Sequence, residues 1–348
     1  MNAAEILTSL AEPEIIKRGL SDDNKWLINM ILNERFRQLD EDLGLIYEEI
    51  KHKFMKKTDF ETLCVKNYKE KLDIILSKHI IPDNVLHKIK CLNPEIADII
   101  KDYRCKQTNK QFDKYTSYRV NLTIMSHAKN KGLEPHLMIK KNSKSLARVA
   151  SKIPRKIYEE SIKRGVIGGR TDYDVKDGLI KDFKGLQLVT LKPYRDDKQI
   201  LNLQIDPITT LKSYFVNPKT SNIEVVEIVN HYEKLGDYGA IHLKVRYSPI
   251  GNAKSIDSGV SEVPKDFIEI QIIDIENFLK KEIGHLNQLN YAFRQASFKD
   301  REFLEDMKKL RNQNARVRSL SKKSEKEHKE YINKCKSFLL DVLTHHYE

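Results

Sequence analysis

Basic residues recur at helical spacing in the segment 143–165. Residues about four apart lie on the same face of an α-helix, so this segment predicts a stripe of like charges. A triphosphate would relieve the repulsion in such a stripe, and the charges would then stabilise a transition state. The alternative is an ordinary basic helix face in contact with solvent. The candidate residues are Lys144, Arg148, Lys152 and, continuing the series, Arg155 or Lys156.

Two carboxylates next to predicted strands are candidate metal ligands. Asp182 precedes the strand-like segment Gly185–Pro193, and a carboxylate beside phosphates is a natural Mg²⁺ ligand, although a lone Asp is also a common turn residue. Glu269 and Gln271 are two residues apart, so both point to the same face of a strand. We interpret Glu269 as a metal ligand or general base that Gln271 orients. The alternative is a strand face exposed to solvent.

An aromatic residue and a histidine lie close together in KLGDYGAIHLKV. Tyr238 follows a Gly-Asp turn, where an aromatic ring can stack on a nucleobase. His242 lies four residues later and would donate to a phosphate or a ribose. The alternative for His242 is a histidine that faces the core and bonds to the backbone.

The elements that must position these residues follow from the apolar periodicity. Apolar residues at three-to-four spacing predict a long helix over Trp26–Phe54, with Asp22 or Asp23 as its cap. Short apolar and β-branched runs predict strands between residues 136 and 274. Further helices are expected over Leu63–Ile81, Asn84–Tyr103, Asn109–Lys129 and Ser143–Gly165. The expected strands are His136–Lys141, Gly185–Pro193, Ile223–Asn230, Ala240–Tyr247 and Asp266–Asp274.

These elements divide the 348 residues into three parts. Residues 1–135 form an expected helical N-terminal region, residues 136–295 a domain of strands and helices, and residues 296–348 a basic helical C-terminal extension. Strands with helices between and after them predict an α+β fold, in which helices flank a mixed β-sheet.

The composition restricts the class of protein. The formal net charge of +12 favours polyanionic partners such as nucleotides, RNA or acidic membranes, although a lysine-rich solvated surface would give the same charge. The four cysteines form no C-x-x-C pair, which argues against a zinc knuckle and favours a reducing, cytoplasmic environment. No apolar run is long enough for a transmembrane helix, and the acidic N-terminal segment does not resemble a signal peptide.

Taken in order, these motifs resemble the synthetase domain of the RelA/SpoT alarmone family over about residues 136–295. The resemblance covers a strand followed by the basic helix and an Asp-x-x-Gly element, Asp182-Phe-Lys-Gly185. A Tyr-x-x-x-His element, a Glu-x-Gln-Ile strand and a helix with a His and a Tyr follow. These are Tyr238 and His242, Glu269 to Ile272, and His285 and Tyr291.

The resemblance implies a nucleotidyltransferase-like sheet and a pyrophosphokinase of the GTP/GDP type. Such an enzyme moves pyrophosphate from ATP to the 3′-hydroxyl of a guanosine nucleotide, which is the alarmone synthesis of the stringent response. The basic residues would hold the donor phosphates, Asp182 and Glu269 would hold Mg²⁺, and Tyr238 would stack on the acceptor base. Self-association is compatible with this reading. No His-Asp pair is present, so the N-terminal region does not resemble the family's hydrolase.

The sequence departs from the family at four places near the expected phosphates. Gln187 and Ile273-Asp274 replace an Arg and an Arg-Thr, His231-Tyr232 replaces Asp-Tyr, and Asn142 replaces an Arg. Two alternatives therefore remain beside alarmone synthesis. One is a toxin-type pyrophosphokinase that acts on the 3′ end of tRNA, which the basic tail favours. The other is a catalytically degenerate protein that binds RNA or nucleotides.

Overall fold

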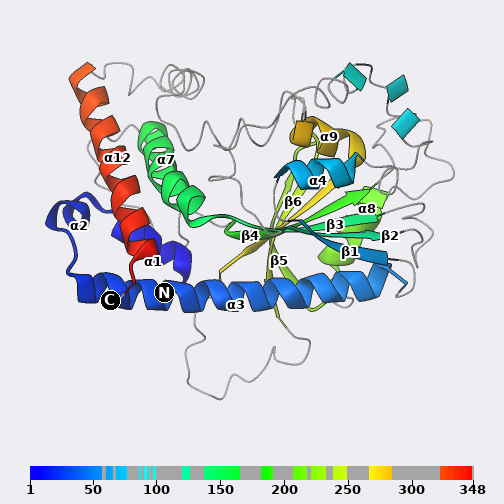
Figure 1. Ribbon diagram of the computed structural model, residues 1–348, viewed down its shortest axis with the longest axis horizontal. Helices are drawn as coiled ribbons and strands as arrows, with labels where there is room; N and C mark the ends of the chain where they lie inside the picture. The colour runs from blue at the N-terminus through cyan, green and yellow to red at the C-terminus, as the bar shows by residue number, and fades with distance from the viewer. Residues whose placement is uncertain are drawn as a thin grey trace, which may run out of the picture.

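The structure is a computed structural model, and the helices and strands that it describes lie around one β-sheet (Figure 1). Helices lie on both faces of the sheet, and α3 runs the length of one side. The described residues are 1–56, 60–65, 68–76, 86–87, 90–91, 94, 97–98, 120–125, 137–164, 182–190, 207–217, 221–232, 238–248, 266–283 and 322–346.

The sheet has seven strands in the order β1-β2-β3-β4-β7-β6-β5. β4 and β7 are parallel, and every other neighbouring pair is antiparallel, so the sheet is mixed as the sequence predicted. The strands are β1 (Phe60–Val65), β2 (Val120–Met125), β3 (Leu137–Ser143), β4 (Lys184–Thr190), β5 (Ile223–Asn230), β6 (Ile241–Tyr247) and β7 (Ile268–Asp274).

The helices are shared between the two faces of the sheet. One hydrophobic cluster joins α1, α3, α7, α8 and α12 to the side chains on one face, and a second joins α4 and α9 to the other face. The helices are α1 (Ala3–Leu10), α2 (Pro13–Arg18), α3 (Asp22–Phe54), α4 (Tyr68–Ile75), α7 (Leu146–Arg164), α8 (Pro207–Val216), α9 (Ile275–Ile283) and α12 (Lys322–Thr344).

Strand alternation decides what each face contains. Leu186 and Leu188 of β4 are buried in the cluster under α3, whereas Gln187 and Val189 point to the side of α9. The same alternation places Ile268, Ile270 and Ile272 of β7 toward α3 and places Glu269, Gln271 and Ile273 on the opposite side. The face under α3 is therefore apolar, and the face under α9 is polar near its centre.

The long helix α3 extends beyond the segment that periodicity predicted. Buried residues recur along it at three-to-four spacing, and its 33 residues span about 50 Å. Its cap is Ser21, whose hydroxyl accepts from the backbone N–H of Asn24, and not Asp22 or Asp23. Those two aspartates lie in the first turn, where a negative charge favours the helix dipole.

Two strands lie where the sequence predicted helices. β1 covers the start of the helix expected over Leu63–Ile81, and β2 lies within the helix expected over Asn109–Lys129. The two strands pair antiparallel over six residues, so sheet pairing outweighs local helix preference. Most of the helix expected over Asn84–Tyr103 falls outside the described residues. Residues before 136 thus contribute strands to the same sheet as the central region.

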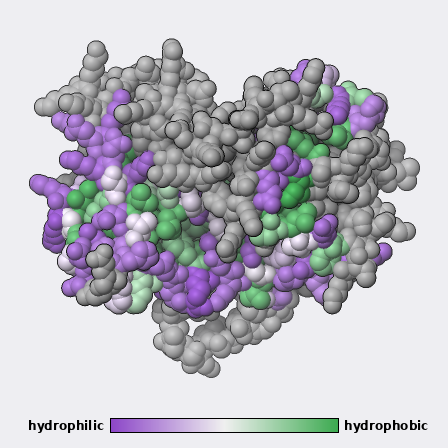
Figure 2. All heavy atoms as spheres, viewed as in Figure 1, coloured by the Kyte–Doolittle hydropathy of each residue, from purple (hydrophilic) through white to green (hydrophobic). Residues whose placement is uncertain are grey.

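The remaining expected elements agree with the structure. The five strands predicted from His136 onward are confirmed as β3 to β7, and the basic helix predicted after residue 143 is α7, which Ser145 caps. Figure 2 shows hydrophilic and hydrophobic residues interspersed over the described part of one side of the molecule. None of the described helices has both the length and the apolar character that crossing a membrane requires.

Candidate active site

Asp182 lies where α7 meets the start of β4. The Nζ atoms of Lys144 and Lys152 lie 2.6 Å and 2.5 Å from its Oδ2. The backbone N–H of Lys144 donates to the carbonyl of Phe183 at 2.9 Å, which fixes the end of β3 beside the start of β4. Two of the predicted phosphate-binding lysines thus converge on the predicted metal ligand.

The charges at this cluster depend on one another. Burial alone would raise the pKa of Asp182, but Lys144 and Lys152 outweigh it and hold that pKa well below its usual range. Burial lowers the pKa of Lys144 to about 8, although Asp182 opposes this effect. The carboxylate is therefore ionised at neutral pH, and the ammonium of Lys144 titrates close to neutrality.

A second carboxylate, Glu269, faces the same side from β7. Its Oε1 lies 3.2 Å from Nδ1 of His242, and its Oε2 accepts from the amide of Gln271 at 2.5 Å. The hydroxyl of Tyr238 lies 3.0 Å from Nε2 of His242. An ionised carboxylate can only accept, so Nδ1 donates to Glu269, and Nε2 of a neutral ring accepts from the tyrosine. Four predicted residues form one hydrogen-bonded chain.

Glu269 is strongly acidic in this setting. Burial would raise its pKa, and the negative charge of Asp182 acts in the same direction. The hydrogen bond from His242 and the charge of Lys144 outweigh both, and the pKa falls to about 2. The electrostatic effect of Asp182 on Glu269 indicates that the two carboxylates belong to a single site. Their side chains are each 19% exposed, so a ligand can reach both.

Gly185 allows β4 and β7 to approach each other at this site. It lies opposite Glu269 in the parallel register. A Cβ atom at position 185 would lie 2.7 Å from the backbone oxygen of Glu269, which is too close for any other residue without a shift of the strand. The glycine of the Asp-x-x-Gly element is thus a packing requirement, which lets the start of β4, just after Asp182, lie beside Glu269 of β7.

Two further polar residues join this chain: Lys281, which no sequence motif identified, and Gln187, which was singled out only as a departure from the family. Lys281 of α9 donates to Oε1 of Gln271 at 2.6 Å, and the amide of Gln187 donates to the same oxygen at 3.0 Å. Gln187 is only 1% exposed, and its own Oε1 is buried without a hydrogen-bond partner in the described part of the chain. In the sequence, a glutamine inside the apolar run of β4 indicates a polar position within the sheet, whereas no sequence pattern indicates a role for Lys281.

A buried ion cluster lies under the same face. The Oε1 of Glu282 accepts from Lys140 at 2.7 Å, and its Oε2 lies 2.5 Å from the ammonium of Lys71. Burial would raise the pKa of Glu282, but the two lysines lower it to about 2. The cluster links α4, β3 and α9 beneath the candidate site.

Polar contacts also hold Tyr232 and Gly239 near the candidate site. The hydroxyl of Tyr232 donates to Oδ2 of Asp274 at 2.7 Å, and the side chain of Asn277 accepts from the N–H of Gly239 at 3.0 Å. Asp274 is one of the residues at which the sequence departs from the family motifs, whereas Tyr232 keeps the tyrosine of the Asp-Tyr pair. The contact therefore joins a changed position to a retained one.

Three other predicted phosphate-binding residues also lie on α7. Arg155 is buried, and Arg148 and Lys156 are half-buried. Within the described residues, none of the three forms an ion pair with Asp182 or Glu269. The structure therefore brings Lys144 and Lys152 to the carboxylates and leaves the rest of the stripe apart.

The donor set fits a magnesium ion that a substrate would complete. Among the described residues, no group of three or more His, Cys, Asp or Glu side chains could hold a metal by itself. Mg²⁺ commonly takes one or two carboxylates and fills its remaining positions with phosphate oxygens and water. Asp182 and Glu269 are ionised oxygen donors whose mutual repulsion a shared cation would relieve, so their chemistry suits this arrangement.

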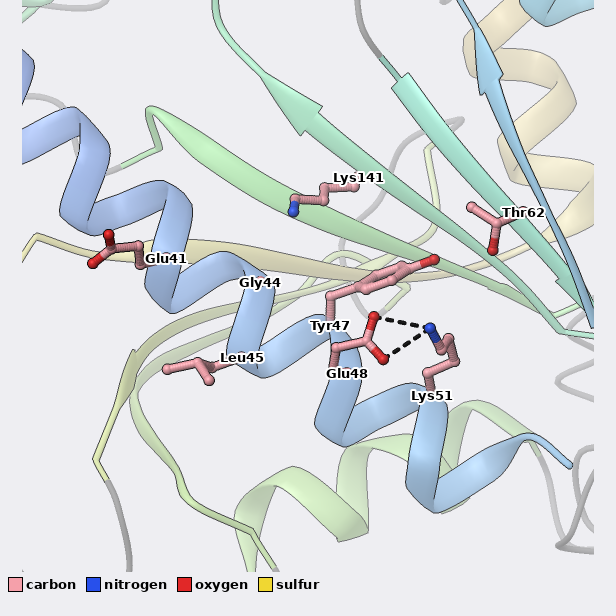
Figure 3. A pocket seen from close by; sticks show the side chains of 8 residues that line it. All are labelled: Glu41, Gly44, Leu45, Tyr47, Glu48, Lys51, Thr62 and Lys141. Atoms are coloured by element: carbon pink, nitrogen blue, oxygen red, sulfur yellow. Dashed lines mark hydrogen bonds and ion pairs between the residues drawn. The ribbon is translucent and has the colours of Figure 1, made fainter. Parts of the chain in front are cut away.

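A separate cavity of about 690 Å³ lies on the opposite face of the sheet (Figure 3). Its walls come from α3, and Lys141 of β3 and Thr62 of β1 reach it from the sheet. Lys141 alternates with Lys140, whose side chain joins Glu282 on the other face. The cavity and the candidate site are therefore on different sides of β3.

No known protein-family model and no curated protein matches the chain. Among solved structures, the small alarmone synthetase 1 of Bacillus subtilis bound to its product pppGpp shares 19% identity, over 58% of this chain and 80% of that chain, with a TM-score of 0.26. A GTP pyrophosphokinase family protein from Streptococcus pneumoniae shares 15% identity, over 78% and 97%, with a TM-score of 0.25. Both belong to the group that the sequence motifs resemble.

Proposed function

We propose that this protein is an ATP-dependent pyrophosphokinase that transfers pyrophosphate to the 3′-hydroxyl of a guanosine nucleotide. The observation that supports this function most directly is the pairing of Asp182 with Lys144 and Lys152, close enough to a second ionised carboxylate, Glu269, to influence its charge. Transfer of this kind needs positioning, charge neutralisation and a proton acceptor, without a covalent enzyme intermediate.

Each residue has a role in the proposed step. The acceptor 3′-oxygen bonds to the β-phosphorus of ATP, the bond from that phosphorus to the oxygen of AMP breaks, and the proton passes to the Glu269–His242 pair. Lys144 and Lys152 neutralise the transferred phosphates, and the acceptor base stacks on Tyr238. Asp182 and Glu269 would hold Mg²⁺, which supplies charge neutralisation when bound.

A second candidate function is the same transfer to the 3′ end of tRNA. The net charge of +12 favours this reading, because it attracts a polyanion more strongly than a small acceptor requires. Both functions would use the same carboxylates and lysines, so only the acceptor distinguishes them.

The test is incubation of the purified full chain with γ-labelled ATP, Mg²⁺ and one acceptor at a time: GDP, GTP or bulk tRNA. Label on GDP or GTP would support alarmone synthesis, and label on tRNA would support the second candidate. Asp182→Asn is the matched variant, and we expect it to lose any transfer that the wild type shows. Absence of transfer to every acceptor would contradict the proposal and would favour a protein that only binds nucleotides.

A further inference from the structure

The lysines under the polar face differ in their partners. Four of them contact carboxylates, whereas Lys281 donates to the neutral amide oxygen of Gln271. Within the described residues Lys281 forms no ion pair with a carboxylate. The four paired lysines are Lys144 and Lys152 on Asp182, and Lys71 and Lys140 on Glu282.

The position of Lys281 sets what its ammonium can reach. Its Nζ lies 5.9 Å from the centre of the Tyr238 ring and 2.6 Å from Oε1 of Gln271. Gln271 in turn bonds to Glu269. The ammonium thus lies over the ring on which the acceptor base would stack, and one residue, Gln271, separates it from the carboxylate at which the 3′-hydroxyl would react. A flexible four-carbon stem lets it reach the edge of a base held on that ring.

The hydrogen-bonding capacity of Lys281 is only partly used. An ammonium has three donors and no acceptor, and one donor goes to Gln271, which leaves two. Guanine presents two neighbouring acceptors, O6 and N7, whereas adenine presents an amino donor beside N7. A lysine ammonium can therefore donate to O6 and N7 of a 6-oxopurine, whereas the amino group of a 6-aminopurine cannot accept from it.

We propose that Lys281 contacts the base of the acceptor nucleotide and selects guanine over adenine through its 6-carbonyl. This inference rests on the proposed function and names the residue that would set its acceptor specificity. Burial and the charge of Lys140 together lower the pKa of Lys281 to about 8, so its charged form is poorly compensated without a ligand. Acceptor oxygens on a bound base would supply the missing partners.

The test compares the full-length wild type with Lys281→Met in transfer from ATP to GDP, IDP and ADP. Methionine keeps the length and the apolar contacts of the stem but has no donor. We expect the wild type to prefer GDP and IDP to ADP by about tenfold or more, since a good base contact discriminates on this scale. In Lys281→Met the kcat/KM for GDP and IDP should fall about tenfold more than the value for ADP, so the preference is lost.

Lys280→Met is the matched control, because Lys280 is the adjacent lysine of α9 and pairs with Glu276 at 3.3 Å. It should keep the wild-type preference. An equal fall for GDP and ADP in Lys281→Met would overturn the inference, since it would mean that Lys281 only orients Gln271. A preference that survives in Lys281→Met would also overturn it.

A binding measurement distinguishes failure of this inference from failure of the proposed function. If the wild type transfers nothing to any acceptor, calorimetric binding of GDP and ADP still tests the base contact. Tighter binding of GDP by the wild type, lost in Lys281→Met and kept in Lys280→Met, would support the inference. Equal binding of GDP and ADP by the wild type, or tighter binding of ADP, would overturn it.

Discussion

The two faces of the sheet share one backbone but bury different groups. On the side of α3, β7 contributes Ile268, Ile270 and Ile272, which are at most 1% exposed. On the side of α9, the alternate residues Glu269 and Gln271 belong to a network of charges and amides. Burying charges is unfavourable unless they are paired, so a protein retains such a layer at a cost in stability. One face of the sheet therefore maintains the fold, and the other is available for chemistry.

The largest effect is a loss of pyrophosphate transfer, and we expect it on substitution of Glu269, the carboxylate on the polar face. Glu269→Gln removes the charge that binds His242 and would hold the metal, and it should lower pyrophosphate transfer by about 10³-fold, within the range for a positioned acid–base group. ATP affinity should stay within a few-fold, which equilibrium binding would measure. The exposed Glu227, which pairs with Lys244, provides the control Glu227→Gln. Wild-type turnover in Glu269→Gln would assign the chemistry to other residues.

A smaller effect is expected for the buried ion cluster, and it concerns stability. Glu282→Gln leaves Lys71 and Lys140 close together without a carboxylate, so it should lower the free energy of unfolding by about 3–5 kcal/mol. Urea denaturation would measure this loss. The control is Glu276→Gln, which breaks a more exposed pair on the same helix and should cost about 0–1 kcal/mol. Equal losses in both variants would show that the polar layer does not depend on Glu282.

The stability of the protein at acidic pH should depend on the same buried ion cluster around Glu282. The folded-state pKa of Glu282 is about 2, and an unfolded glutamate has a pKa of about 4.3. The unfolded chain therefore binds more protons between these values, and stability falls as the pH falls through this window. Melting temperatures between pH 6 and pH 3 would show the decline. Glu282→Gln should decline less steeply, and a decline as steep as that of the wild type would contradict this assignment.

The smallest effect is expected on the apolar face. Ile270→Val removes one buried methylene without adding a polar group, so it should cost about 0.5–1.5 kcal/mol and leave kcat unchanged. Thermal denaturation and the transfer assay would measure the two quantities on the same preparation. A large loss of kcat in Ile270→Val would mean that the two faces are not independent.

Strand alternation made much of the sheet predictable from the sequence. The period-two pattern in Ile268–Asp274 placed Glu269 and Gln271 on one face, and the structure agrees. Both predicted lysines meet Asp182, but only Lys152 does so from α7, because the helix begins at Leu146 and Lys144 precedes it. Local periodicity predicted the faces of β7 and of α7, but not the position of Lys144.

The rest depends on contacts between distant segments. β2 has the composition of a short apolar segment and becomes a strand because β1 and β3 lie on either side of it. Lys281 lies in a helix whose periodicity fixes its face, but its contact with Gln271 requires α9 to pack on β7. The pairing of Tyr232 with Asp274 joins residues 42 positions apart, which no local pattern encodes.

The parallel pairing of β4 with β7 has a mechanical consequence. β1 to β4 form one antiparallel block and β7 to β5 form another, and this single parallel pair is the seam between them. Parallel pairing is slightly less stable per residue than antiparallel pairing. Asp182 lies on the β4 side of the seam and Glu269 on the β7 side. A partial opening along this line would separate the two carboxylates while each block kept its hydrogen bonds, so we expect activity to be lost before secondary structure as the protein unfolds.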